Sequence, residues 1–381
     1  MIYLDNAATT FPKPKSVYEK MDWANRNIAV NAGRGSYKLA REASGLIDET
    51  RELLLEVVHS TGYEKAVLTT SATMSLHIIL NGIEFNEGDV VYVSPFEHNA
   101  VARTLNEISV NRKIVIKELP LMDGTMSIDL EKTKYLFIKD KPKCVCCTHV
   151  SNVTGYILPI CQIFEAAKIQ NAITVLDASQ SFGLVNIDVR EIYADFIVFA
   201  GHKTLYGPIG VAGFIDVAGY KLKTVIAGGT GSDSLNLSMP KESPYCYEAA
   251  SKDIVAIIGL NQALKVLSQE DNFEKEKELS NYLIERLSGI PEIVLYLPDD
   301  KEQHIGVVSF NVEGYKSEDV GSILDEDYDI AVRTGYHCAP YIHRYLLDEK
   351  YLGTIRVGFS ICNSKEEIDV LVNAIMSLID G

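Results

Sequence analysis

The residues best able to do chemistry lie in one short segment, VRTGYHCAPYIH at residues 332–343. Cys338 stands beside His337, with Arg333 and His343 a few positions away. A thiol titrates near ~8.5, and a nearby cation or basic residue lowers that value. The segment therefore indicates a nucleophile, a metal ligand or a half-buried structural cysteine. The metal interpretation ranks last and we expect no metal site, because no CxxC or HxxxH spacing supplies further ligands.

Lys203 is a second reactive candidate, placed after an apolar run in FAGHKTLYGPIG (199–210). A lysine in a glycine-rich loop is usually a surface residue, but a partly desolvated amine can form a Schiff base. Asp177 ends another apolar run, in VLDASQ (175–180). It could cap a helix, or it could pair with the protonated pyridine nitrogen of pyridoxal 5'-phosphate (PLP). The two segments together favour the PLP interpretation.

Short apolar runs alternate with helical patterns through the middle of the chain. The runs are KAVLTT, DVVYVSP, KCVCCTHVS, AITVLDAS and ADFIVFAG. Such alternation predicts an α/β domain with a largely parallel sheet. Ligands of these sheets bind beyond the carboxyl ends of the strands, where Asp177 and Lys203 would lie.

The pattern changes at about Ile254. A long helical stretch, the strand-like VVSFNVEG, the cysteine segment and a last helix indicate a smaller α/β domain. We therefore expect a large cofactor-binding domain at residues 15–253. Residues 1–14 and 254–381 would form a small domain that carries Cys338.

Composition excludes several classes of protein. With 381 residues and a net charge of −16, the chain lacks the basic character of a nucleic-acid binder. No signal peptide and no membrane-length apolar run are recognisable, so we expect no membrane partner. Seven irregularly spaced cysteines fit free thiols in the cytoplasm better than a disulfide framework. Cys144, Cys146 and Cys147 alternate within a strand-like run, and we expect them to be buried as small apolar residues.

A series of motifs carries a resemblance along nearly the whole chain. In order they are LDNAAT (4–9), NAGRGSYKLAREAS (31–44), TSAT (70–73), EHNA (97–100), HVSNVTG (149–155), DASQ (177–180), GHK (201–203), GGTG (228–231) and RTGYHCAP (333–340). The series resembles the cysteine desulfurases, in the class V aminotransferase group of fold-type I PLP enzymes. The short RTGYHCAP form is similar to the Suf-type and selenocysteine lyase-like branch. The resemblance implies an α/β fold, with a mostly parallel seven-stranded sheet in the large domain and a smaller α/β C-terminal domain.

The resemblance also implies roles for residues around the cofactor, PLP. Lys203 would bind PLP covalently and shuttle protons, and Asp177 would keep the pyridine nitrogen protonated. Asn152 and Gln180 would hydrogen-bond the phenolate oxygen of PLP. His98 would stack on the ring and is a candidate for proton transfer.

Phosphate binding requires oriented donors. TTSATMS follows an apolar run and opens a helix, so the N–H groups of Ala72 and Thr73 can hold an anion there. The resemblance adds His202 as a further donor and Thr230, in GGTG, as a hydroxyl supplied to the neighbouring subunit. The last implication makes the enzyme a homodimer, although GGTG alone is more often a turn.

Substrate binding requires a carboxylate clamp, for which the planar fork of arginine is suited. The resemblance places Arg356, in GTIRVGFSICN, in that role, with Arg34 as a weaker candidate from across the dimer. Asn6 and Ala7, in LDNAAT, are further expected substrate contacts. An ordinary surface salt bridge is the alternative for either arginine.

The implied reaction converts L-cysteine to L-alanine and leaves a persulfide on Cys338, whose sulfur is transferred to an acceptor such as a protein. Selenocysteine lyase is one alternative, and an aminotransferase or C–S lyase on the same fold is another. Three departures from the family pattern bear on affinity and substrate choice. Ala200 replaces a usual Ser or Thr, Met74 replaces an acid, and residues 245–257 match only loosely.

Overall fold

Apolar runs in the middle of the chain form a seven-stranded sheet in the order β2-β8-β7-β6-β5-β3-β4. The structure, a computed structural model, describes residues 1–32, 35, 37–231, 235–267 and 271–380. The strands are β2 (Lys65–Thr69), β3 (Val90–Val93), β4 (Val115–Glu118), β5 (Cys144–Thr148), β6 (Ile173–Asp177), β7 (Phe196–Ala200) and β8 (Ala212–Asp216). Only β8 runs antiparallel to its neighbours. The expected mostly parallel seven-stranded sheet is confirmed.

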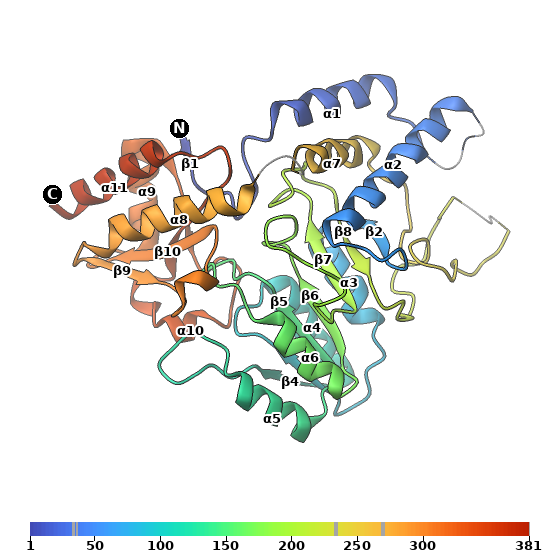
Figure 1. The fold of residues 1–381 in the computed structure, drawn as a ribbon, viewed down its shortest axis with the longest axis horizontal. Coiled ribbons are helices and arrows are strands. Elements are labelled where there is room, and N and C mark those ends of the chain that lie inside the picture. Colours follow the sequence, from blue (N-terminus) through green and yellow to red (C-terminus); the bar gives the residue numbers. More distant parts are fainter. Residues whose placement is uncertain (33–34, 36, 232–234, 268–270, 381) are drawn as a thin grey trace.

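The central strands are apolar because helices cover both faces of the sheet (Figure 1). Every residue of β5, β6, β7 and β8 is buried. Cys144 and Cys146 share a core with helices α3 (Ala72–Gly82) and α4 (Asn99–Arg112). Cys147 faces the opposite core with α6 (Ile160–Ile169) and α7 (Ile254–Leu267). All three cysteines are free and fully buried, as expected.

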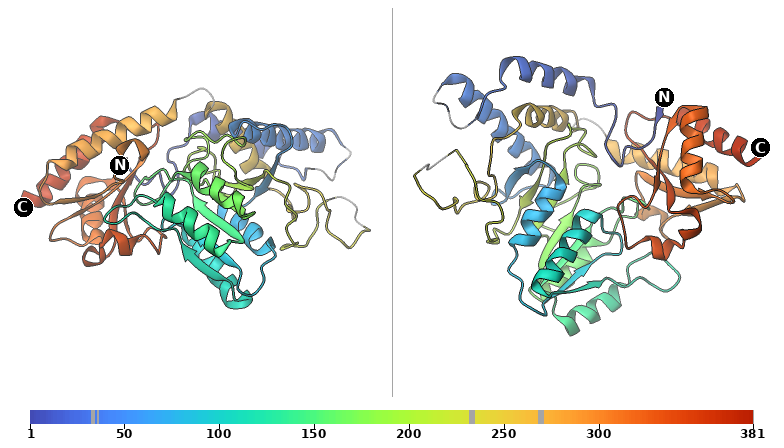
Figure 2. Two further views of the ribbon diagram at one scale, coloured as in Figure 1. Left: turned by 60° about the horizontal axis from the view of Figure 1, so that its bottom comes forward. Right: turned by 180° about the vertical axis from the view of Figure 1, so that it is seen from behind.

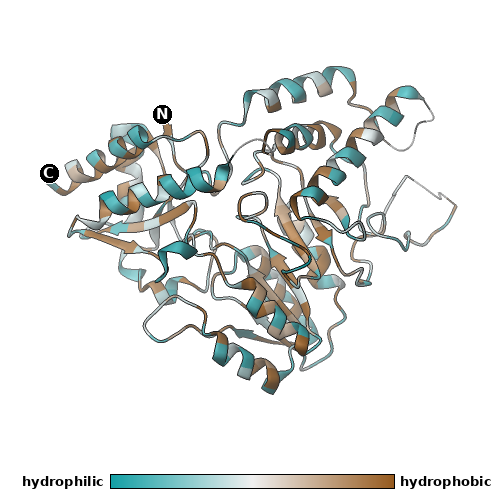
Figure 3. Cartoon of the chain, in the orientation of Figure 1, coloured by the Kyte–Doolittle hydropathy of each residue, from teal (hydrophilic) through white to brown (hydrophobic). Residues whose placement is uncertain are grey.

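The helices of the large part present apolar faces to these cores and polar faces to solvent (Figure 3). They are α1 (Lys15–Asn27), α2 (Lys38–Val57), α3 (Ala72–Gly82), α4 (Asn99–Arg112), α5 (Leu130–Asp140), α6 (Ile160–Ile169) and α7 (Ile254–Leu267). Side-chain caps fix three of their starts: Ser71 on α3, His98 on α4 and Asp129 on α5. Two of these caps lie at the edge of the sheet where the candidate site residues are found.

The small part is a four-stranded antiparallel sheet, in the order β12-β13-β10-β9, packed against helices. Its strands are β9 (Ile293–Tyr296), β10 (Val307–Val312), β12 (Arg333–Gly335) and β13 (Thr354–Gly358). Its helices are α8 (Asn272–Ser288), α9 (Ser317–Tyr328), the short α10 (His343–Leu346) and α11 (Lys365–Asp380). The N-terminal β1 (Ile2–Tyr3) pairs with β11 (Ile330–Ala331), so both chain ends lie in this part (Figure 2).

Helix α7 packs against α1 and α2, and its buried side chains belong to the core of the large sheet. The division into two domains stays a prediction, but this packing places α7 with the large part instead of the small one. We therefore propose a boundary after Leu267 in place of the expected one at residue 254. The sequence pattern suggested the earlier boundary because α7 and α8 read as one long helical stretch.

The segment between β8 and α7 holds no helix or strand among its described residues and projects from the body (Figures 1 and 2). Leu235 and Leu237 lie in this segment and are fully exposed. Across the described residues, no helix combines the length and apolar character needed to cross a membrane.

Candidate active site

A cavity of about 250 Å³ lies where the carboxyl edge of the large sheet meets the small part. Its lining includes Lys203 from the loop after β7 and Cys338 from the turn after β12. These residues are separated by more than a hundred positions in the sequence, and the fold brings them to one cavity. The lining also contains nine of the other expected site residues: Ala7, Ala72, Thr73, His98, Asn152, Asp177, Gln180, His202 and Arg356. Ala200, one of the departures from the family pattern, lines the cavity as well.

Lys203 is half-buried, and a hydrogen bond to its backbone carbonyl holds its loop in place. Its carbonyl accepts a hydrogen bond from the Thr10 hydroxyl at 2.8 Å. Burial lowers the pKa of Lys203 to about 8; the Asp177 carboxylate opposes this shift and the Arg356 guanidinium adds to it. The amine can therefore lose its proton near neutral pH, as covalent bonding to a carbonyl carbon requires.

Asp177 ends β6 with its carboxylate buried at the cavity. Its Oδ1 accepts hydrogen bonds from the Ser179 hydroxyl at 2.5 Å and from the Ser179 N–H at 3.0 Å. Gln180 follows on the same turn and donates from Nε2 to the Ala7 carbonyl at 2.8 Å. The DASQ motif thus orients a carboxylate and ties the N-terminal segment to the large sheet.

His98 caps α4 and lines the cavity. Its Nδ1 accepts from the Ala100 N–H at 3.0 Å, so a neutral ring carries its hydrogen on Nε2. The pKa of His98 is lowered to about 4, first by burial and second by the charge of Lys203. The ring is consequently uncharged at neutral pH, which suits stacking on an aromatic group.

The first turn of α3 offers N–H donors that suit an anion. Ala72 and Thr73 begin this helix, where N–H groups lack intrahelical acceptors, and both residues line the cavity. His202 lines it too, and its buried Nδ1 has no hydrogen-bond partner within the described residues. Burial lowers the pKa of His202 to about 4, so the ring is a neutral donor or acceptor. These unused donors suit the phosphate of PLP. Asp177 suits its ring nitrogen, and Lys203 suits its aldehyde.

Arg356 lies on β13 and is 2% exposed, which argues against an ordinary surface salt bridge. Its guanidinium pairs with the Asp5 carboxylate at 2.7 Å and donates to the Asn152 carbonyl at 3.0 Å. Its buried Nε has no partner within the described residues. The arginine is therefore held in place at the cavity with one donor unused.

Cys338 sits in a tight turn in which His337 and Cys338 both adopt left-handed backbone angles, with φ of 46° and 58°. The Arg333 guanidinium approaches the Cys338 sulfur at 3.7 Å. His337 was an expected activator, but its Nε2 faces the Thr354 hydroxyl and carbonyl. Burial lowers the pKa of His337 well below its ordinary value, so the cation beside the thiol is Arg333.

Two of the described residues that were expected at the site, Asn6 and Thr230, lie elsewhere. Asn6 is buried outside the cavity lining, and its amide donates to the Gly358 carbonyl at 2.9 Å and to Asn363 at 3.1 Å. It therefore fixes the N-terminal segment instead of facing a substrate. Thr230 lines a different cavity, beside α2, and is not at the Lys203 site of its own chain. Arg34 lies outside the described residues.

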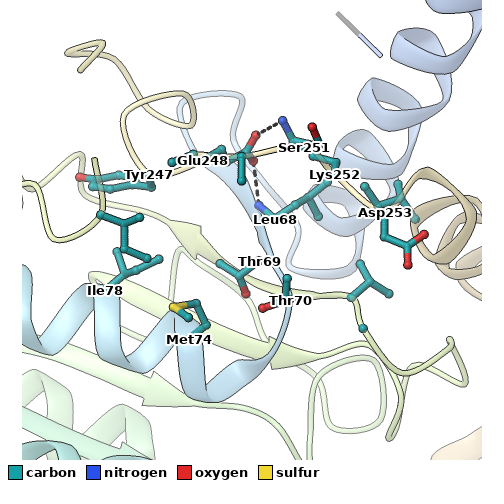
Figure 4. A pocket seen from close by; sticks show the side chains of 16 residues that line it. Leu68, Thr69, Thr70, Met74, Ile78, Tyr247, Glu248, Ser251, Lys252 and Asp253 are labelled. Carbon is teal, nitrogen blue, oxygen red and sulfur yellow. Dashed lines mark hydrogen bonds and ion pairs between the residues drawn. The ribbon is translucent and has the colours of Figure 1, made fainter. Parts of the chain in front are cut away.

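The departures in Met74 and residues 245–257 meet in a neighbouring apolar cavity of about 270 Å³ (Figure 4). Met74 and Tyr247 supply apolar walls. Glu248 accepts from the Leu68 N–H at 2.8 Å and pairs with Lys252 at 2.9 Å, so it supports β2. Met74 lines this cavity and not the cavity of Lys203.

Two residues of the site were not singled out from the sequence. Asp5 pairs with Arg356, and Ser179 holds Asp177. Ser179 was detectable from its position two residues after an aspartate, a spacing typical of local turns. Asp5 had no such signal, because its partner is far along the chain. No cluster of histidine, cysteine or acidic side chains suited to a metal occurs among the described residues.

This chain is similar to known proteins over nearly its whole length. Residues 2–371 match the aminotransferase class V family. The chain is 34% identical to a probable cysteine desulfurase of Halalkalibacterium halodurans, with 98% of this chain and 92% of that protein covered. It is 33% identical to a probable cysteine desulfurase of Pyrococcus abyssi, with 100% and 94% covered. The apo structure of a cysteine desulfurase from Thermococcus onnurineus NA1 has a TM-score of 0.91 at 29% identity, covering 100% of this chain and 95% of that one.

The chain therefore belongs to the class V aminotransferase family. The relatives compared above are named cysteine desulfurase or probable cysteine desulfurase and match it over nearly full length, so the resemblance seen in the ordered motifs is confirmed.

Proposed function

We propose that the protein is a PLP-dependent cysteine desulfurase that converts L-cysteine to L-alanine through a persulfide on Cys338. The observation that carries this proposal is the single cavity shared by the Lys203 amine and the Cys338 thiol. A transaminase needs the amine but has no use for the thiol. The near full-length similarity to cysteine desulfurases supports the same choice.

Each part of PLP has residues in the cavity that would hold it. Lys203 and Asp177 suit its aldehyde and ring nitrogen, His98 suits its ring face, and Asn152 and Gln180 suit its phenolate. Ala72, Thr73 and His202 suit its phosphate. When bound, PLP supplies an electron sink that stabilises negative charge at the substrate's α-carbon.

The chain's own residues perform the remaining tasks. Arg356 binds the substrate carboxylate, for which its planar fork and unused Nε are suited. Lys203, with a pKa of about 8, moves protons to and from the substrate's α-carbon. The Cys338 sulfur bonds to the substrate sulfur while the bond from that sulfur to carbon breaks. A persulfide then remains on Cys338, and protonation completes L-alanine.

A homodimer is part of the proposal. The projecting segment between β8 and α7 carries exposed leucines, Leu235 and Leu237, that a second subunit would cover. Thr230 lies in this segment, away from its own Lys203 cavity, and would reach the neighbouring site. A protein that accepts the persulfide sulfur, and a cytoplasmic location suited to free thiols, complete the proposal.

The test supplies L-cysteine and, in parallel, L-selenocysteine to the PLP-loaded enzyme. Alanine from L-cysteine and a mass increase of one sulfur atom on the Cys338 peptide are expected. A Lys203→Ala variant should lose both products and the visible absorbance of the bound cofactor. Alanine formed only from L-selenocysteine would favour the lyase alternative, and pyruvate-dependent amino transfer would favour an aminotransferase.

A further inference from the structure

The turn that presents Cys338 is unusual because two consecutive residues without glycine's freedom, His337 and Cys338, take left-handed backbone angles. Such conformations persist only where surrounding contacts hold them. Each carbonyl of the turn has a donor. The His337 carbonyl accepts from Asn152 Nδ2 at 2.8 Å, and the Cys338 carbonyl accepts from the Asn99 N–H at 2.6 Å. Both of these donors belong to the large part.

The Tyr336 carbonyl is held by residues of the small part. It accepts from the Ala339 N–H at 2.9 Å, which closes the turn, and it faces Nε2 of His343 at 3.0 Å. The His343 ring also packs edge-on against the Tyr336 ring, with centroids 5.0 Å apart. His343 therefore contacts both the backbone and the side chain of the residue that opens the turn.

The second nitrogen of His343 fixes the orientation of the ring. Its Nδ1 lies 2.5 Å from Oδ2 of Asp348, and both side chains are buried, with Asp348 1% exposed. A carbonyl oxygen can only accept, so Nε2 must carry a hydrogen. The proton between Nδ1 and the Asp348 carboxyl can sit on either group, and Nε2 remains a donor to Tyr336 in both cases.

We propose that His343, oriented by Asp348, is a positioning residue that holds the Cys338 turn in its reactive geometry. Neither His343 nor Asp348 lines the cavity, so the pair acts through the turn and does not touch the substrate. The inference rests on the proposed nucleophilic role of Cys338. It gives a role to His343, which lies close to Cys338 in the sequence and for which the sequence predicted no specific role.

Two substitutions of His343 distinguish its contact with the Tyr336 carbonyl from its contact with Asp348. In His343→Gln the side-chain amide can replace Nε2 and donate to the Tyr336 carbonyl. In His343→Asn the shorter amide can replace Nδ1 beside Asp348 but cannot reach Tyr336. His304→Leu serves as the matched control, because it also removes a buried histidine that faces a backbone carbonyl, that of Val307 at 2.7 Å, outside the cavity.

The experiment measures single-turnover persulfide formation on Cys338 and the steady-state kcat and KM for L-cysteine in the PLP-loaded enzymes. We expect His343→Asn to slow persulfide formation and kcat about tenfold, with KM and the first absorbance change on adding L-cysteine within about twofold of wild type. His343→Gln should recover most of the rate, and His304→Leu should leave it unchanged.

The proposal is overturned if His343→Asn forms persulfide at the wild-type rate, if His343→Gln is as slow as His343→Asn, or if His304→Leu slows the step equally. The alkylation rate of Cys338 by iodoacetamide, relative to exposed Cys161 in the same molecule, gives a measure that needs no turnover. It should differ from wild type at least threefold in His343→Asn only. A Cys338→Ser variant that still makes alanine would reject the proposed function instead, whatever the His343 variants do.

Discussion

Asn152 donates from Nδ2 to the backbone carbonyl of His337 over 2.8 Å, and its own carbonyl accepts from Arg356 at 3.0 Å. A residue that follows the large sheet thereby holds both the cysteine turn and the arginine of the small part. The turn that carries Cys338 and the guanidinium of Arg356 are thus both held by one residue of the large part.

Asn152→Ala should reduce kcat about tenfold, because a buried carbonyl left without its donor costs about 1–3 kcal/mol and the turn loses its link to the large part. Steady-state desulfuration of L-cysteine measures the effect. Asn152→Asp is the matched variant, since it keeps the shape but turns an acceptor toward the His337 carbonyl, and it should be at least as slow. Wild-type kcat in both variants would contradict this role.

Glu276 on α8 offers a test of the junction between the two parts. It is buried and accepts a hydrogen bond from the Tyr206 hydroxyl at 3.0 Å. Burial raises its pKa from an ordinary value of 4.5 to about 8. The folded protein therefore keeps this proton where the unfolded chain releases it, and stability is lost as pH rises from about 4.5 to 8.

Glu276→Gln keeps an acceptor for Tyr206 and removes the titration. Its advantage over wild type in the free energy of unfolding should grow between pH 5 and pH 8, by about 1.4 kcal/mol for each pKa unit of the shift. Urea unfolding at a series of pH values measures it. Glu285→Gln, on the exposed face of the same helix, is the control. An advantage that is constant with pH would refute the assignment.

His98 should remain an uncharged ring down to about pH 5, because burial and the nearby Lys203 lower its pKa to about 4. Histidine NMR signals of the cofactor-free protein, assigned with a His98→Gln variant, report its titration. Signals that shift little between pH 8 and pH 5.5 are expected. A midpoint near 6.5 would show that the ring is not shielded as described.

Ala200 ends β7 inside the cavity, where related enzymes commonly carry a hydroxyl. Ala200→Ser should tighten PLP binding about fivefold, since one added hydrogen bond contributes about 1 kcal/mol. Absorbance titration of the cofactor-free protein with PLP gives the dissociation constant. Ala200→Val adds bulk without a hydroxyl and should weaken binding. Equal constants for the serine variant and wild type would mean that this departure has no effect on affinity.

Much of this architecture was predictable from sequence because local signals were strong. Apolar runs ending in Asp177 or leading to Lys203 marked the strands and the edge where ligands bind. The boundary that we propose after α7 differs from the expected one because α7 and α8 are both helical, and the packing of α7 against α1 and α2 could not be predicted from the sequence. The roles of Asp5, Asn6 and His337 depend on partners hundreds of positions away or on burial, neither of which composition or spacing reveals.

In the proposed reaction, the Cys338 sulfur accepts the substrate sulfur while Lys203 moves protons on the same bound amino acid. Alanine production from L-cysteine by PLP-loaded wild type and Cys338→Ser tests it most directly. We expect the serine variant to retain the visible absorbance of bound cofactor and to form alanine at least a hundredfold more slowly. Equal alanine from the two proteins would contradict it.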